Sequence, residues 1–280
     1  MNARDEFSLA RADVRKAFDR AARDYDAAAV LQRAVGERLL ERLELTKMAP
    51  ERIADLGCGT GRPTRELLRR YPEAQVVGVD LAPNMLKLAG RRPWYAPWRK
   101  GAHLVCADAA ALPLATTSFD LLYASLVLQW CEDLDATLLE WRRLLKHHGL
   151  LLFSTLGPDT LKELRAAWSE VDGYNHVNRF LDMHDIGDAL IRAGFAEPVM
   201  DVERVTLTYD DARGLMRDLK RIGAHNVTAG RGRGLTGRGR MDAMGRAYER
   251  WRQDGRLPAT YEVVYGTAWA PSFMPKAAIS

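Results

Sequence analysis

A glycine-rich stretch between an apolar run and an amphipathic run constrains this chain more than any other feature. Residues 53–56 are mainly apolar, Gly57, Gly59 and Gly61 follow at alternate positions, and residues 65–71 have helical spacing. This order predicts a strand, a tight turn and a helix. Glycine tolerates positive φ and lets a ligand approach bare backbone, and the first N–H groups of a helix can receive an anion. The stretch therefore predicts an α/β unit with a ligand held at the turn.

A second strand and two acids make this turn more specific. Residues 75–79 are expected to form the next strand, which ends at Asp80, nineteen residues after Gly61. An acid at such a strand end can accept hydrogen bonds from ribose hydroxyl groups. The spacing G-x-G-x-G, with Asp55 two residues before the first glycine, resembles the nucleotide-binding motif of class I S-adenosylmethionine-dependent methyltransferases. A glycine turn with a purely structural purpose in another α/β unit is the alternative.

Strands and helices alternate through the middle of the chain, and this alternation predicts a parallel sheet with helices on both faces. The expected strands lie near 52–56, 75–79, 103–106, 119–124, 150–155, 199–207 and 261–269. The expected helices lie near 9–45, 62–71, 83–91, 135–147, 158–171, 183–193 and 212–222. The strand at 261–269 alternates in polarity, which is typical of the edge of an antiparallel sheet.

The expected fold class is α/β, with a doubly wound, mostly parallel seven-stranded sheet of the class I methyltransferase, Rossmann-like type. Residues 1–48 are expected to form an N-terminal helical lid, and residues 49–280 the methyltransferase domain. Helical insertions are expected at about 157–194 and 210–257. The lid would bring Tyr25 to the ligand, although a plain core position for this aromatic is an equal alternative.

Composition limits the class of protein further. With 280 residues, of which 47% are hydrophobic, the chain can bury one sizeable core. It has no apolar run of about 18 residues, so no membrane span is expected, and its N-terminus has no apolar signal core. Its three cysteines form no C-x-x-C pair, which indicates a reducing, cytoplasmic location without disulfides or a zinc site. The net charge of +4 fits either an acidic partner or an ordinary solvated surface.

The carboxyl ends of the other strands supply further candidates for ligand contacts, because ligands of doubly wound sheets sit at those ends. Asp108 follows the third strand and could accept from an adenine amino group, or simply cap the next turn. Gln129 and Trp130 follow the fourth strand and could reach a donor or an acceptor ligand. The cofactor-binding candidates are Asp55, Gly57, Gly59, Gly61, Asp80, Leu81, Asp108, Ala109, Leu126 and Gln129.

Three other stretches invite functional interpretations. Residues 146–149, Lys-His-His-Gly, are predicted to end a helix rather than to bind a metal. The Arg- and Gly-rich residues 230–240 resemble a short nucleic-acid-binding tract, but their place inside the fold favours a basic surface loop. The Pro-rich aromatic residues 91–98 fit a packed connection better than an interaction surface. No metal site, membrane contact or nucleic-acid partner is therefore expected.

Dispersed motifs across nearly the whole chain resemble the malonyl-acyl-carrier-protein O-methyltransferase family of biotin synthesis. They lie at residues 18–32, 55–61, 128–131, 176–181, 219–224 and 260–262. The resemblance implies that S-adenosylmethionine donates a methyl group to the free carboxylate of a malonyl thioester on acyl carrier protein, or on coenzyme A, early in pimeloyl synthesis. The alternatives are a methyltransferase-like assembly factor without catalysis, as in the related factor of respiratory complex I, and another class I methyltransferase acting on RNA or a small molecule.

The resemblance also implies residues for the acceptor. A carboxylate is already ionised at pH 7, so its methylation needs no general base. Arg179 is a candidate for holding it, because a guanidinium is a planar fork suited to carboxylates, although a salt bridge between the inserted helices is an alternative. His176 and Lys220 are further candidates, and Tyr25 completes the catalytic set. The implied carrier is acidic, and the candidate contacts are Arg142, Arg143, Lys146, Arg217, Lys220, Arg221, Arg231 and Arg233.

Overall fold

The structure is a computed structural model that describes residues 10–91, 101–224 and 237–272. Most of the expected aromatic loop at 91–98, and most of the Arg- and Gly-rich tract at 230–240 with Arg231 and Arg233, lie outside these residues. Within the described residues, no helix is long and apolar enough to cross a membrane.

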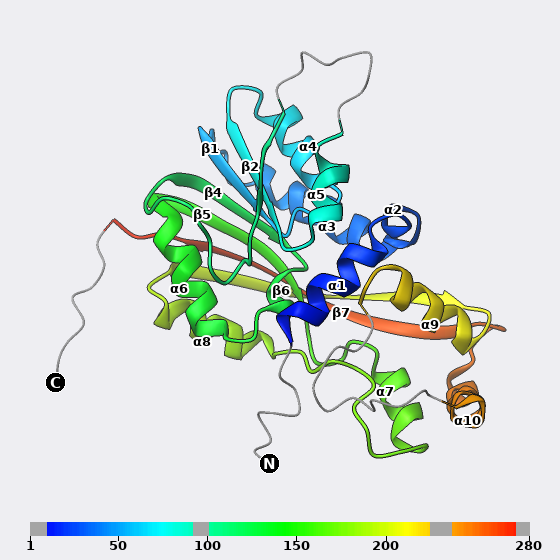
Figure 1. The fold of residues 1–280 in the computed structure, drawn as a ribbon. Coiled ribbons are helices and arrows are strands. Elements are labelled where there is room, and N and C mark those ends of the chain that lie inside the picture. The colour runs from blue at the N-terminus through cyan, green and yellow to red at the C-terminus, as the bar shows by residue number, and fades with distance from the viewer. Residues whose placement is uncertain (1–9, 92–100, 225–236, 273–280) are drawn as a thin grey trace. The chain divides into compact units, whose positions relative to one another are not determined.

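A seven-stranded sheet in the order β3-β2-β1-β4-β5-β7-β6 organises the described chain (Figure 1). Strands β1 to β5 pair in parallel, which confirms the expected doubly wound, mostly parallel sheet. The strands are β1 Arg52–Leu56, β2 Gln75–Asp80, β3 His103–Cys106, β4 Phe119–Ser125, β5 Leu145–Leu156, β6 Ala196–Tyr209 and β7 Leu257–Trp269.

Strand β7 is an interior strand, so its expected place at the sheet edge is wrong. It lies between β5 and β6, and β6 is the edge strand. The backbone N–H of His148 donates to the carbonyl of Ala270 at 2.7 Å, and the N–H of Ala270 donates to Gly149 at 2.8 Å, as in an antiparallel pair. The expected antiparallel direction is therefore confirmed. The polar residues that suggested an exposed face are half-buried or buried, because their side chains bond to a neighbouring turn.

The central strands are apolar and buried because helices cover the sheet. Helices α4, Arg62–Arg70, and α5, Pro83–Ala89, lie beside β1 and β2 in Figure 1. Helix α6, Leu134–Leu144, packs against α8, Met183–Arg192. Trp141 of α6 is fully buried, and its indole N–H donates to the carbonyl of Ala109 at 2.8 Å. These contacts anchor the loops at the carboxyl ends of the strands.

From residue 10 to residue 48 the described N-terminal region has three helices rather than the single helix expected at 9–45. They are α1 Arg11–Ala21, α2 Tyr25–Ala28 and α3 Val30–Glu44. The chain leaves the helical region at Ala29, where ψ is 51°, and the N–H of Ala29 closes α2 on the carbonyl of Tyr25. The apolar stripe continued across these breaks because α1 and α3 each bury their own apolar residues.

The predicted helix end at 146–149 is also wrong, because helix α6 ends at Leu144 and these four residues belong to β5. The last carbonyls of the helix accept from the backbone N–H groups of residues 117 and 118, so the chain can turn directly into the strand. The register between β4 and β5 then jumps from the pair Phe119–Leu145 to the pair Leu121–Leu150. Residues 146–149 form the resulting bulge, a feature that helical periodicity cannot reveal.

The remaining described elements are helices α7 Lys162–Ser169, α9 Ala212–Arg221 and α10 Arg238–Tyr248, and the short 3-10 helices η1 Leu128–Trp130 and η2 Glu249–Trp251. The helix expected at 158–171 is shorter because Leu161 has a positive φ of 55°, which ends a turn before α7.

The chain divides into two compact units, each described by itself below. The smaller unit comprises Met1–Leu31, Leu156–Leu181 and Val202–Val263. The larger unit comprises Gln32–Thr155, Asp182–Asp201 and Val264–Ser280.

Candidate functional site

The glycine loop of the larger unit has a backbone that other residues adopt with difficulty. Gly57, Gly59 and Gly61 have φ angles of +69°, +54° and +82°. A Cβ on Gly57 would lie 2.7 Å from Cγ2 of Val127, and one on Gly61 would lie 2.8 Å from Cβ of Ala89. A Cβ on Gly59 would meet no atom within 4 Å. Packing thus demands glycine at the outer two positions, whereas the middle glycine leaves open space at its backbone.

Asp80 at the end of β2 connects this loop to the start of α5. Its Oδ2 accepts from the N–H of Gly59 at 2.8 Å, and its Oδ1 accepts from the N–H of Ala82 at 2.8 Å. Burial raises the pKa of Asp80, and the backbone N–H donors oppose that shift. The backbone N–H of Leu81 is a third donor to this carboxylate. A carboxylate can accept at about four positions, so the group can hold the loop and still accept from a ribose hydroxyl.

Asp55 lies beneath the loop and is only 1% exposed. Its Oδ2 accepts from Oγ1 of Thr64, on α4, at 2.5 Å. Burial raises the pKa of Asp55 to about 7; the Thr64 bond lowers it, and the nearby charge of Asp80 adds a smaller upward effect. Burial likewise raises the pKa of the Cys58 thiol. This geometry makes Asp55 a support that joins β1 to α4, and sequence reasoning missed its partner Thr64 because an isolated threonine carries no signal.

The other cofactor candidates also follow strand ends of the larger unit. Oδ1 of Asp108 accepts from the N–H of Ala110 at 2.9 Å, so this side chain does cap a turn. The side-chain amide of Gln129 donates to the carbonyl of Leu126 at 2.8 Å and accepts from Oγ1 of Thr155 at 3.2 Å. Because β1 to β4 are parallel and adjacent, their carboxyl ends meet at one edge of the sheet, and the structure brings these candidates together there.

The acceptor candidates belong to the smaller unit. Tyr25 begins α2 and is half-buried, whereas Arg179 is exposed in the loop after α7. In the same loop, Nε2 of His176 lies 2.7 Å from Oδ1 of Asp172, and the imidazole stacks on the ring of Trp168. Sequence reasoning missed Asp172, although an acid four residues before a candidate histidine was a visible signal.

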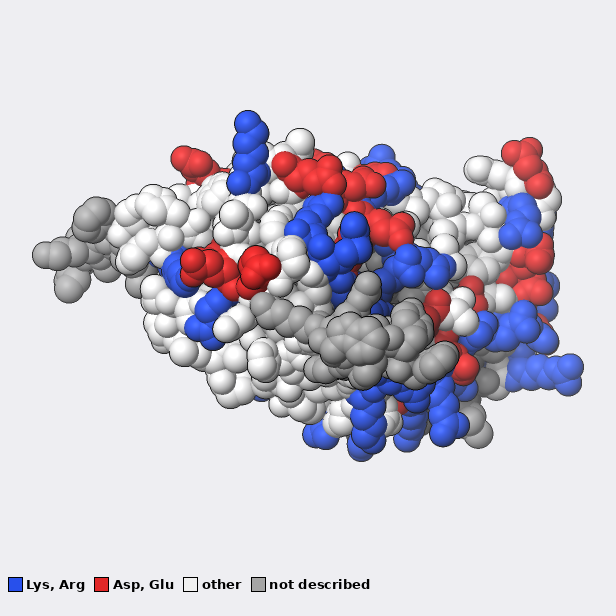
Figure 2. Space-filling view, turned by 90° about the horizontal axis from the view of Figure 1, so that it is seen from above, with Lys and Arg blue, Asp and Glu red and all other residues white. Residues whose placement is uncertain are grey.

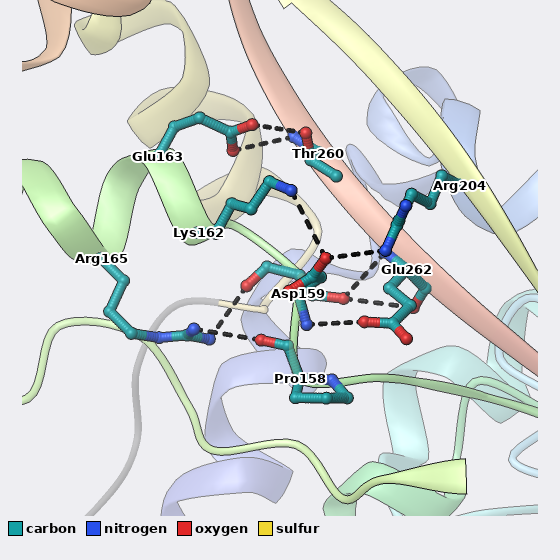
Figure 3. A network of polar contacts seen from close by, with 9 residues as sticks. Pro158, Asp159, Lys162, Glu163, Arg165, Arg204, Thr260 and Glu262 are labelled. Atoms are coloured by element: carbon teal, nitrogen blue, oxygen red, sulfur yellow. Dashed lines mark hydrogen bonds and ion pairs between the residues drawn. The ribbon is translucent and has the colours of Figure 1, made fainter.

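A polar network fixes the turn that leads into α7, as Figure 3 shows. Oε2 of Glu262 accepts from the N–H of Asp159 at 2.7 Å, and the buried carboxylate of Glu163 accepts from both the N–H and the hydroxyl of Thr260. A Cβ on Gly157 would lie 2.7 Å from Cδ of Glu262, so only glycine leaves room for this carboxylate. The Thr-Tyr-Glu motif at 260–262 therefore has a structural purpose in holding this turn.

Three of the basic residues proposed to contact a carrier have partners within the protein. Arg142 is only 9% exposed and donates to the carbonyls of Gly194 and Pro271, so its assignment as a docking contact is wrong. Arg143 pairs with Glu140 at 2.8 Å, and Lys146 pairs with Asp120 at 2.8 Å. By contrast, three exposed basic residues of α9 form no ion pair within the described chain. They are Arg217, Lys220 and Arg221.

Comparison with known proteins adds the family to this geometry. The methyltransferase-domain family matches residues 54–153. The malonyl-[acyl-carrier protein] O-methyltransferase of Laribacter hongkongensis is 56% identical, with 97% of this chain and 93% of the relative covered. The enzyme of the same name from Gallionella capsiferriformans is 55% identical, with 96% and 93% covered. This chain belongs to the malonyl-[acyl-carrier protein] O-methyltransferase family.

Membership of the malonyl-[acyl-carrier protein] O-methyltransferase family confirms the expected enzyme class, an S-adenosylmethionine-dependent O-methyltransferase, and nothing favours the assembly-factor, RNA or small-molecule alternatives. A solved structure of a putative methyltransferase from Bacillus halodurans is similar with a TM-score of 0.61, at 17% identity, covering 84% of this chain and 99% of that one. That similarity concerns the fold alone. The open backbone at Gly59 and the remaining acceptor position of the Asp80 carboxylate fit a nucleotide-like donor.

Proposed function

We propose that this protein transfers a methyl group from S-adenosylmethionine to the free carboxylate of a malonyl thioester on acyl carrier protein. The product would be the malonyl methyl ester, an early intermediate of pimeloyl and biotin synthesis. The observation that carries the proposal is the 56% identity to the Laribacter hongkongensis enzyme over 97% of this chain. A cytoplasmic location is part of the proposal, because its three cysteines are free thiols.

The glycine loop and the strand ends would hold the donor. S-adenosylmethionine supplies the methyl group on an electrophilic sulfonium. The backbone at Gly57 and Gly59 would face it, Asp80 would accept from its ribose, and Asp108 would accept from its adenine amino group. Leu81, Ala109, Leu126 and Gln129 would line the same pocket, and Asp55 and Gly61 would keep the loop in shape. This assignment is supported by the positive φ angles of the glycines and by the hydrogen bond from Gly59 to Asp80.

The reaction requires the protein to align the carboxylate oxygen with the methyl carbon and the sulfur, and it requires no proton transfer. A lone pair of the acceptor carboxylate forms the new O–C bond while the C–S bond breaks and its electron pair stays on sulfur. The carboxylate is already ionised at neutral pH, so no general base is needed. An anion and a cation give two neutral products, so excluding water helps both ions to react. Arg179 and His176 would hold the carboxylate, and residues 1–48, with Tyr25, would act as a lid.

We further propose that the carrier docks on the basic residues of α9. A Cβ on Gly223, just after α9, would lie 3.2 Å from the carbonyl oxygen of Ala17, so the end of α9 packs against α1. Exposed Arg20 and Arg23 lie at the end of α1 and just after it. Figure 2 shows positive and negative side chains interspersed over one face, so a docking surface has to be defined residue by residue. The docking residues proposed are Arg217, Lys220 and Arg221.

Replacing all three α9 residues by alanine should raise KM for malonyl-acyl carrier protein several-fold at low salt and flatten its dependence on ionic strength, because charge-steered docking is screened by salt. Arg213→Ala is the matched control, since Arg213 already pairs with Asp242 on α10. Malonyl-coenzyme A, which lacks the carrier surface, should react equally with both variants. An unchanged salt dependence in the triple variant would exclude this surface.

The proposed function is tested by transfer of labelled methyl from S-adenosylmethionine to malonyl-acyl carrier protein. Acetyl-acyl carrier protein, which has no free carboxylate, is the control acceptor. Label in an alkali-sensitive ester on the malonyl carrier alone would support the proposal. Retained donor binding without any transfer would contradict it.

A further inference from the structure

His176 is held in one orientation by two neighbours of the smaller unit. Its ring stacks on that of Trp168, with centroids 3.7 Å apart and planes only 8° from parallel. Trp168, on α7, is 2% exposed, so the stacking platform is itself fixed. Nε2 of His176 lies 2.7 Å from Oδ1 of Asp172. The stack fixes the plane of the imidazole, and the hydrogen bond fixes its rotation within that plane. A histidine on a solvated surface lacks both restraints.

The hydrogen bond also decides which ring nitrogen carries a proton. Burial raises and the bond from His176 lowers the pKa of Asp172, and the net shift is downward, so the carboxyl is ionised at neutral pH. An ionised carboxylate can only accept, so Nε2 must be the donor. Nδ1 then holds a lone pair in the neutral ring and an N–H in the imidazolium. Nδ1 has no partner among the described residues and is not one of their buried, unpartnered polar atoms.

The net charge of the groups around the ring favours an anionic ligand. Asp172 is the acid bonded to His176, and Nη1 of Arg240, on α10, lies 3.7 Å from the other oxygen of Asp172. The uncharged neighbours are Trp168 and Tyr174, whose ring lies 6.0 Å from the Arg240 guanidinium. When His176 is protonated, the group of Asp172, His176 and Arg240 carries one net positive charge. That charge can be balanced by a ligand at Nδ1.

We propose that Asp172 is a positioning residue that keeps the His176 imidazolium oriented so that Nδ1–H donates to the carboxylate of the malonyl group. The proposal rests on the proposed function and deepens it, because it gives the acceptor site a second charged donor on the same loop as Arg179. Asp172 itself does not touch the acceptor; it sets the charge and the direction of the residue that does. A phosphodiester on the carrier arm presents the same anionic chemistry, so the experiment must separate the two sources.

The proposal predicts a pH dependence of acceptor binding. KM for malonyl-acyl carrier protein should rise with increasing pH, because the neutral imidazole, with its proton on Nε2, has no N–H to donate at Nδ1. Asp172→Asn removes the carboxylate that orients and stabilises the imidazolium, so KM should be raised even at the acidic end of the pH series. At pH 6 the variant should show a KM about tenfold above that of the wild type, as expected for a lost charge-assisted hydrogen bond, with kcat within about twofold because the aligned complex still reacts.

Asp172→Asn and His176→Gln are compared with His184→Gln across pH 6 to 8.5. His184 is the matched control, because its Nδ1 also lies 2.8 Å from an aspartate, Asp182, but its side chain is 83% exposed. Affinity for S-adenosylhomocysteine should stay unchanged in all three variants. The inhibition constant of S-malonyl-N-acetylcysteamine, a thioester without phosphate, separates the sources: a rise parallel to KM assigns the malonyl carboxylate, and no rise overturns that assignment.

Absence of methyl transfer by the wild type would defeat the proposed function itself. A wild type that turns over, beside an Asp172→Asn variant with the same KM and the same pH profile, would overturn only the role of Asp172. If Asp172→Asn also loses affinity for S-adenosylhomocysteine, the variant has a wider structural defect, and the His176→Gln variant then tests the proposal instead. In His176→Gln, a raised KM for malonyl-acyl carrier protein that no longer varies with pH supports the proposal. A KM with the same value and the same pH dependence as in the wild type overturns it.

Discussion

The glycine loop at 57–61 and the loop at 172–181 are held in opposite ways. In the first, the backbone N–H of Gly59 donates to Asp80 and the φ angles of three glycines set the path. In the second, side-chain contacts hold the loop. His176 stacks on Trp168 and bonds to Asp172, and Asp172 forms an ion pair with Arg240. A backbone-held loop tolerates no added Cβ at its packed positions. A side-chain-held loop should tolerate small changes in shape while losing specific kinetic properties.

Gly57→Ala should give the largest effect, because it adds both a clash and backbone strain. The new Cβ would lie 2.7 Å from Val127, at a φ of +69°. We expect a loss of about 3–5 kcal/mol in the free energy of unfolding, measured by urea denaturation. Adding Val127→Ala should restore the part due to the clash but not the part due to φ. A Gly57→Ala protein as stable as the wild type would show that the loop is not held by its backbone.

Asp55→Asn should change how stability depends on pH. The pKa of Asp55 in the folded protein is about 7, against about 3.9 in an unfolded chain. Between these values the folded state binds more protons, so stability falls as pH rises from about 4 to about 7. The amide oxygen of asparagine can still accept from Thr64, so the variant should remove a pH-dependent loss of up to about 4 kcal/mol.

Urea denaturation of Asp55→Asn and wild type at pH 5 and pH 8 checks this. The variant should gain stability relative to wild type at pH 8 and gain little at pH 5. Asp135→Asn, which removes an exposed surface acid paired with Arg192, is the control and should leave the pH slope unchanged. Parallel pH profiles of stability for Asp55→Asn and wild type would mean that Asp55 does not titrate between pH 5 and pH 8, and burial would then not raise its pKa into this range.

Gly59→Ala sharpens the contrast within the glycine loop itself. Its Cβ would meet no protein atom within 4 Å, so the cost to folding should be limited to the strain at φ +54°, about 1–2 kcal/mol. The added methyl group would instead occupy the space proposed for the donor. The Kd for S-adenosylhomocysteine, measured by calorimetry, should rise at least about tenfold, equivalent to about 1.4 kcal/mol. Unchanged affinity would place the donor elsewhere.

The same contrast explains what the sequence could predict. The glycine spacing, Asp80 and the alternation of strands and helices are local signals of backbone geometry. They predicted the fold class, which is confirmed, and they placed the cofactor candidates at the strand ends, where binding stays a prediction. The bulge at 146–149 was missed because it comes from the register between two strands rather than from local periodicity. The interior position of β7 was missed because its polar residues, which suggested an exposed edge, serve an internal network.

The proposed acceptor side is harder to predict from sequence because its parts come from distant elements. His176 was a candidate from a motif, but its platform Trp168 lies on α7 and Arg240 on α10. No spacing rule joins these residues. Likewise, the burial of Arg142 follows from the tertiary positions of the carbonyls of Gly194 and Pro271, so the residue type alone suggested a surface contact.

Arg179→Ala tests whether the side-chain-held loop carries function separately from stability. Arg179 is exposed, so replacing it should cost less than about 0.5 kcal/mol of folding free energy. If its guanidinium holds the acceptor carboxylate, KM for malonyl-acyl carrier protein should rise several-fold to about tenfold, with affinity for S-adenosylhomocysteine unchanged. Arg213→Ala, which breaks only the surface pair with Asp242, is the control and should leave both constants unchanged. A large loss of stability with an unchanged KM would instead make Arg179 a structural ion-pair residue.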